Sequence, residues 1–179
     1  MAKGKGWKHR QSNYPAHYTK NRINNVMKAE RRYLTEGKTR EKHLNELCVN
    51  VTEILGKHYC AAMMKDFGVS ESKLSEVTRS VDDISRWYTG MKKINGITVA
   101  VKALKESVKD ILPDTFWIPD LIDKAEDEKK AMKDAAELTA RIYCKAINNV
   151  LGYDKEKIGQ VFRTARQMYR ECVAASESC

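Results

Sequence analysis

The sequence predicts an all-α protein of about six helices. Its 179 residues include only 9 glycines and 3 prolines, whereas helix-favouring alanine, lysine, glutamate and leucine are abundant. Apolar residues also recur at intervals of three and four along most of the chain, which places them on one face of a helix. A chain of this length is long enough to bury a core as one domain, with or without an arm.

The N-terminal part predicts an irregular arm and then a helix. Gly4, Gly6 and Pro15 interrupt regular structure over residues 1–19. Residues 20–36 have helical apolar spacing, and Gly37 supplies a stop. The apolar residues of this helix are Ile23, Val26, Met27, Tyr33 and Leu34. We expect the helix to dock on the rest of the protein as a basic ridge.

Two long helices are predicted next. Thr39 is a suitable N-cap for one that ends at Gly68, and Ser70 is a suitable N-cap for its successor. The apolar stripe of the first comprises Leu44, Leu47, Val51, Ile54, Leu55, Tyr59, Ala62 and Met63. That of the second comprises Leu74, Val77, Val81, Ile84 and Tyr88. The alternating steps of three and four in the second stripe are typical of a seam against another helix.

A turn is expected at Asn95–Gly96, and the segment after it is ambiguous. Residues 97–101 (Ile-Thr-Val-Ala-Val) are rich in β-branched residues and suit a short strand. We favour a helix, because Leu104, Val108 and Ile111 continue the helical period as far as Pro113.

The C-terminal half predicts an apolar connector and two more helices. The connector, residues 113–119, contains Phe116 and Trp117, which we expect to pack on the body. Asp120 is expected to cap a long helix that ends at Leu151. Asp154 is expected to cap a last helix that reaches about residue 174.

The chain matches itself at an offset of 84 residues. The paired segments are residues 59–62 and 143–146 (Tyr-Cys-Ala-Ala and Tyr-Cys-Lys-Ala), and 67–70 and 151–154 (Phe-Gly-Val-Ser and Leu-Gly-Tyr-Asp). In the second pair the glycine can end a helix and the following serine or aspartate can cap the next. The match predicts two similar helical hairpins, at 44–90 and 120–174. Coincidence of helical composition is the alternative.

Positive charge is confined to one end of the chain. Residues 1–43 contain 12 lysines and arginines against 3 acidic residues, a net charge of +9, whereas the remaining 136 residues contain 21 of each sign. We therefore predict a basic arm and first helix at 1–43 and a neutral helical body at 44–179. A polarised chain of this kind is typical of proteins that bind polyanions.

The basic segment predicts contacts to nucleic acid. Lysine and arginine neutralise phosphates, and Trp7 can stack on exposed bases. The candidate residues are Lys3, Lys5, Trp7, Lys8, His9, Arg10, Lys20, Arg22, Lys28, Arg31, Arg32, Lys38, Arg40 and Lys42. The alternatives are a solvated surface, a disordered arm, or an arm that grips an acidic protein.

Residues 67–77 resemble the turn and recognition helix of repressor-type helix-turn-helix domains. The turn glycine, the valine after it and the cap serine all match that pattern. The resemblance implies that four residues face bases, namely Glu71, Ser72, Lys73 and Glu76. A plain helical hairpin fits the same residues, and the length of both flanking helices and the neutral charge of the body favour it.

The two helix junctions also resemble small helical proteins of phages and prophages from Gram-positive bacteria. In that pattern a helix ends in Phe-Gly-(aromatic)-Gly and the next begins with a basic residue and leucine. Here Ser70 and Asp154 replace the second glycine. The resemblance implies an origin in a mobile element.

Enzymatic and metal sites are not indicated. His58 and Cys60 are two positions apart and so point to different sides of a helix. The sequence contains no phosphate-binding glycine loop, metal-binding His/Glu pair or serine elbow, and we expect no cofactor. An enzyme is the least favoured of three possible functions.

The sequence also bears on location. Five widely spaced cysteines, without a CxxC motif, predict free thiols in a reducing compartment. We find neither a secretory signal nor an apolar run of membrane-spanning length. A cytoplasmic protein is therefore expected.

Two functional hypotheses follow. The first is a non-enzymatic nucleic-acid-binding protein, for DNA or RNA, of phage or mobile-element type. The second is a phage inhibitor or adaptor, for example an anti-CRISPR protein, that binds a host nucleic-acid enzyme or its guide or target complex. A homodimer through the exposed sides of the apolar stripes is compatible with either.

Overall fold

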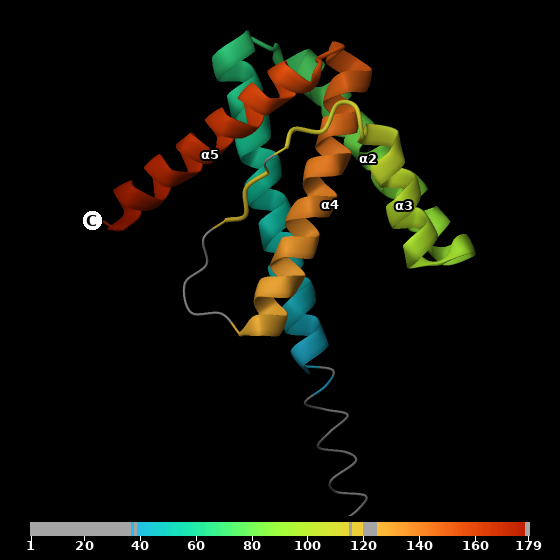
Figure 1. The fold of residues 1–179 in the computed structure, drawn as a ribbon. Coiled ribbons are helices and arrows are strands. Elements are labelled where there is room, and N and C mark those ends of the chain that lie inside the picture. The colour runs from blue at the N-terminus through green and yellow to red at the C-terminus, as the bar shows by residue number, and fades with distance from the viewer. Residues whose placement is uncertain (1–36, 38, 115, 120–124, 178–179) are drawn as a thin grey trace, which may run out of the picture. The chain divides into compact units, whose positions relative to one another are not determined.

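The computed structural model describes residues 37, 39–114, 116–119 and 125–177, which form five helices and no strand. The first helix includes Gly37 and residues 39–67, so the predicted stop at Gly37 and the predicted N-cap at Thr39 are wrong. The others are α2 (Glu71–Asn95), α3 (Ile97–Val108), α4 (Glu126–Leu151) and α5 (Lys155–Glu177) (Figure 1). The predicted all-α class is confirmed. The predicted arm and the helix at 20–36 lie outside the described residues.

Contacts divide the chain into two compact units, Met1–Asn45 and Glu46–Cys179. The second unit is the helical body, and helix 46–67 is the part of the first helix that belongs to it.

The two junctions predicted by the repeat have the expected local geometry. Gly68 has φ +61° and Gly152 has φ +67°, the left-handed conformation that glycine adopts without strain. The Ser70 hydroxyl accepts a hydrogen bond from the Lys73 N–H at 3.4 Å. The Asp154 carboxylate accepts the equivalent bond from the Lys157 N–H at 3.0 Å. Both predicted helix caps are therefore confirmed.

Two further predicted boundaries need correction, and one ambiguity is resolved. Residues 97–101 are helical, as we favoured, but α3 ends at Val108 and a turn precedes Pro113. The prediction that Asp120 caps the fourth helix is wrong, because α4 begins at Glu126. There the Glu128 carboxylate accepts the Ala125 N–H at 3.1 Å. The Asp127 carboxylate accepts the Glu128 N–H at 3.0 Å, a bond that an N-cap side chain would otherwise form.

Helix 46–67 and α4 run parallel and side by side (Figure 1). Three contacts follow one another along the pair. The Cys48 thiol donates to the Ala131 carbonyl at 3.6 Å, the Thr52 and Thr139 hydroxyls lie 3.2 Å apart, and Tyr59 meets Tyr143 with ring centroids 5.2 Å apart. The sequence separations of these contacts, 83, 87 and 84, are close to the repeat offset. Residues at or near positions related by the repeat therefore face one another.

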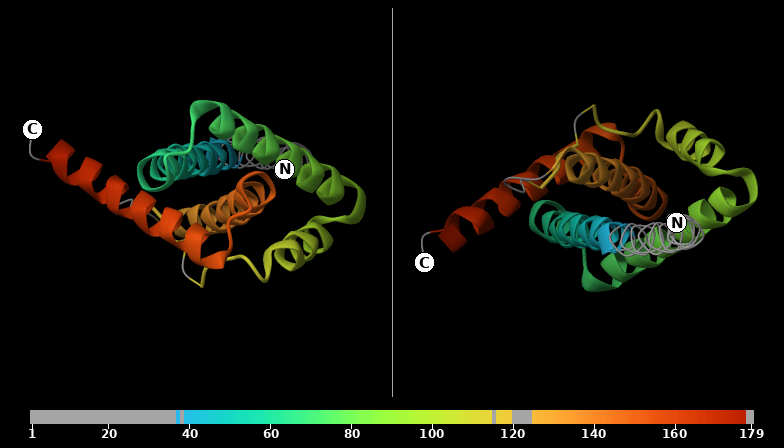
Figure 2. Two further views of the ribbon diagram at one scale, coloured as in Figure 1. Left: turned by 90° about the horizontal axis from the view of Figure 1, so that it is seen from above. Right: turned by 90° about the horizontal axis from the view of Figure 1, so that it is seen from below.

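The second helix of each predicted hairpin packs on the first helix of the other. α2 lies along α4, whereas α5 diverges from α4 and crosses helix 46–67 (Figures 1 and 2). Phe162 of α5 stacks on Tyr59 at 4.5 Å between centroids, and the Thr164 hydroxyl donates to the Asp66 carboxylate at 2.5 Å. The repeat predicted two successive helix pairs along the chain. The structure adds which helix of one pair packs on which helix of the other.

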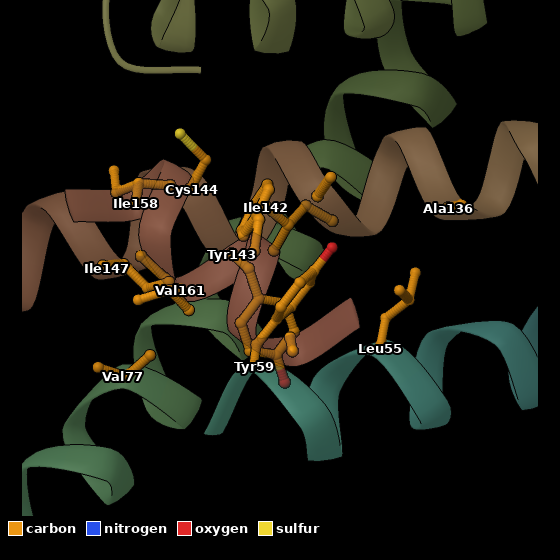
Figure 3. Close-up of a cluster of buried hydrophobic side chains, with 14 of the residues drawn as sticks. Leu55, Tyr59, Val77, Ala136, Ile142, Tyr143, Cys144, Ile147, Ile158 and Val161 are labelled. Carbon is orange, nitrogen blue, oxygen red and sulfur yellow. The ribbon is translucent and has the colours of Figure 1, made fainter. Parts of the chain in front are cut away.

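The core lies where these helices meet. Leu55, Val77, Ile147, Ile158 and Val161 are fully buried there (Figure 3). As expected, the connector packs on this body: Trp117 is 5 % exposed, and its ring lies 5.0 Å from that of Tyr169 and 6.1 Å from that of His58.

Candidate functional site

The structure describes two of the fourteen residues predicted to contact nucleic acid. Arg40 is half-buried and Lys42 is exposed, and both are on helix 39–67. The other twelve lie outside the described residues. They are Lys3, Lys5, Trp7, Lys8, His9, Arg10, Lys20, Arg22, Lys28, Arg31, Arg32 and Lys38.

The four residues suggested by the helix-turn-helix resemblance occupy the first two turns of α2, and all are exposed. Lys73 forms an ion pair with Glu76 at 2.7 Å. The helix that carries them has 25 residues, and Val77, Ile84 and Tyr88 of it are buried against the body. This length agrees with a structural helix rather than a short recognition helix.

The body contains a groove that the sequence analysis did not predict. Its volume is about 700 Å³, and its walls come from helix 46–67, α2, α3 and α4. The lining residues are Cys48, Val49, Thr52, Glu53, Tyr88, Lys92, Ile97, Val101, Leu104, Lys105, Ala131, Asp134, Ala135, Glu137, Leu138 and Arg141. We call this the α3 groove. Figure 2 shows the elements around it.

The surface of the α3 groove is largely apolar. Leu104 and Tyr88 are buried at its base, and Val101 is half-buried beside them. At the rim, Val49 is 55 % exposed and Ile97 is 56 % exposed. Large apolar side chains with this exposure around one concavity are typical of binding surfaces.

Charges of opposite sign line the two sides of the α3 groove. The wall formed by helix 46–67 and α4 contains the carboxylates Glu53, Asp134 and Glu137. The wall formed by α2 and α3 contains the ammonium groups of Lys92 and Lys105. We name these the acidic wall and the basic wall. The groove as a whole has no strong net charge, because Arg141 also lies on α4.

Arg141 is the most buried charge of the groove. Its guanidinium pairs with the Glu137 carboxylate at 2.7 Å, and the exposed fractions of the two side chains are 14 % and 24 %. The buried Arg141 Nε has no hydrogen-bond partner among the described residues. The same guanidinium favours the ionised form of Tyr88, although burial, the larger effect, raises the pKa of Tyr88.

Cys48 and His58 each interact with neighbouring groups in the described part of the body. Burial, assisted by the Asp134 carboxylate, raises the pKa of the Cys48 thiol, which keeps it protonated. The His58 Nδ1 lies 2.7 Å from the Ile54 carbonyl, so it is used within its own helix. Within the described ranges, no three His, Cys, Asp or Glu residues cluster in a way that could hold a metal ion.

Sequence reasoning missed the groove for an identifiable reason. Val49 lies outside the apolar stripe of its helix, and Ile97 lies at a helix start, so neither was assigned to a core face. Their exposure became visible only when α3 was placed against its neighbours. The one signal of the groove in the sequence was an apolar residue, Val49, that lies outside the apolar stripe of its helix.

In the described part of the chain, no helix is long and apolar enough to cross a bilayer. No protein-family model, curated protein or solved structure matches the sequence.

Proposed function

We propose that the protein is a non-enzymatic, cytoplasmic nucleic-acid-binding protein of phage or mobile-element type. In this proposal the basic segment 1–43 contacts phosphates of DNA or RNA, and the helical body serves as the scaffold. Trp7 stacks on an exposed base. Such contacts determine affinity more than sequence preference.

The observation that supports the proposal most strongly is the separation of charge. The first 43 residues have a net charge of +9, and the rest of the chain has none. If the excess charge served solubility alone, it would have no need to be concentrated at one end. The phage origin has separate support from the two junctions, at Gly68 and Gly152.

Charge-matched variants test this proposal. The arm variant replaces four residues by glutamine: Lys3, Lys5, Lys8 and Arg10. The body variant replaces four exposed lysines by glutamine: Lys65, Lys93, Lys102 and Lys133. The two variants lose the same formal charge, so any difference between them reports position rather than net charge.

Binding to labelled duplex DNA, single-stranded DNA and RNA is measured by fluorescence anisotropy at one salt concentration. We expect the arm variant to weaken binding by at least about tenfold, because phosphate contacts are lost, and the body variant to have a much smaller effect. Equal losses in the two variants would contradict a localised phosphate-binding segment.

A second function, the inhibitor or adaptor, is favoured by the α3 groove. Nucleic-acid binding through residues 1–43 does not use this surface, whereas a protein partner would. Affinity purification with and without nuclease distinguishes the two functions. A partner protein that stays bound after nuclease treatment supports the adaptor, and one that is lost supports nucleic-acid binding alone.

A further inference from the structure

We propose that the α3 groove binds an amphipathic α-helix of a partner protein, with basic residues on one flank of its apolar stripe and acidic residues on the other. The proposal deepens the adaptor function and rests on it. It does not depend on the phosphate contacts of residues 1–43.

The shape of the groove favours a helix. Every wall is a helix, since the lining residues come from helix 46–67, α2, α3 and α4. A helix laid between these walls would pack side chains into theirs as neighbours in a helical bundle do. An amphipathic helix in an apolar groove is a recurring form of peptide recognition.

The apolar rim supplies the attraction. Val49 on helix 46–67 and Ile97 on α3 are each more than half exposed, and they lie on opposite sides of the groove. Val101, about one turn along α3 from Ile97, is half-buried and also lines the groove. A guest helix with aliphatic side chains at spacings of three and four would remove these surfaces from water.

The charges specify the flanks of the guest. Glu53 and Asp134 are on the acidic wall, and Lys92 and Lys105 are on the basic wall. When the apolar stripe of a guest helix faces inward, one flank meets each wall. Complementarity then requires basic residues on one flank and acidic residues on the other. A nucleic acid fits poorly here, because its phosphates have charge of one sign and match only the basic wall.

Designed peptides test the proposal on the full-length chain. Three fluorescent helical peptides of about 20 residues share one leucine stripe and differ in their flanks: one basic and one acidic flank, two basic flanks, or two acidic flanks. We expect the mixed peptide to bind most tightly, with a micromolar Kd. Failure of the mixed peptide to bind, or equal binding of all three, would overturn the proposal.

Variants locate the binding. Ile97→Glu introduces a charge at the rim and should weaken the mixed peptide by at least about tenfold. Met64→Glu is the matched control, because Met64 is 46 % exposed on helix 46–67 but does not line the groove. Equal effects of the two changes would place the binding elsewhere and overturn the proposal. Circular dichroism melting checks that both variants remain folded.

A change of specificity tests the charge pattern. The double variant Lys92→Glu, Lys105→Glu makes both walls acidic. We expect it to prefer the peptide with two basic flanks over the mixed peptide, which reverses the preference of the natural protein. An unchanged order of affinities would contradict the assignment of the walls.

Two further outcomes would assign the groove to another occupant. A dimer in sedimentation analysis that dissociates in Ile97→Glu would assign the groove to a second copy of this chain. Peptide binding that appears only after Val26→Glu and Met27→Glu would assign it to the chain's own N-terminal segment. Either result would overturn the partner proposal. DNA binding by Ile97→Glu should stay unchanged. A failure of the groove proposal is therefore distinguishable from a failure of the proposed nucleic-acid binding.

Discussion

Tyr59 and Tyr143, which are separated by the repeat offset of 84 residues, pack against each other with ring centroids 5.2 Å apart. Next to them, burial raises the pKa of the Cys60 thiol, while a hydrogen bond with Tyr143 lowers it. Phe67 and Tyr153 make a further contact at the junctions, 4.9 Å between centroids. The two halves of the body therefore meet through residues at or near equivalent positions.

The close approach at Tyr143 makes Gly56 sensitive to substitution. A Cβ atom at Gly56 would lie 2.5 Å from the Tyr143 hydroxyl oxygen. We expect Gly56→Ala to lower the free energy of unfolding by about 1–3 kcal/mol. Tyr143→Phe removes that oxygen, so the double variant should recover part of the loss. Chemical denaturation of the four proteins measures the coupling, and strictly additive effects would contradict this explanation.

Two other glycines should respond in opposite ways to replacement by alanine, because their backbone conformations differ. Added Cβ atoms at Gly68 and Gly90 meet nothing within 4 Å, but Gly68 has φ +61° and Gly90 lies inside α2. Gly68→Ala should cost about 1 kcal/mol through strain, and Gly90→Ala should stabilise by about 0.5–1 kcal/mol through helix propensity. Thermal melts should move in opposite directions, and shifts of the same sign would argue against the helix end at Gly68.

Stability should fall at alkaline pH. Burial raises the pKa of Cys144 to about 12 and raises the pKa values of Tyr59 and Tyr143. The unfolded chain, whose thiols ionise near pH 9, then loses protons first, so the unfolding free energy is highest below pH 9 and declines as pH rises toward 12. Each such group contributes a slope of up to about 1.4 kcal/mol per pH unit.

Urea denaturation at several pH values from 7 to 11 measures this decline. In Cys144→Ala the slope just above pH 9 should be smaller, because one of the buried thiols is absent. A flat profile across this range would show that burial does not control these pKa values.

The sequence was most informative where local chemistry decides the structure. Gly68 and Ser70 predicted one helix junction and Gly152 and Asp154 the other, because helix ends depend on the residues that form them. The start of α4 was missed, since Asp120 is a good cap in isolation, while the free N–H groups at the helix start are bonded further along by Asp127 and Glu128. The α3 groove was missed as well, because it depends on how distant helices pack.

The most direct test of the central claim is the salt dependence of nucleic-acid binding by the full-length chain. If the basic segment contacts phosphates, log K should fall linearly with log salt, with a slope of about −0.9 for each phosphate neutralised on duplex DNA. Between about 50 and 200 mM salt we expect affinity to drop at least about tenfold, with a shallower slope in the arm variant (Lys3, Lys5, Lys8 and Arg10 to glutamine). An affinity that barely changes over this range, or an arm variant with an unchanged slope, would contradict the claim.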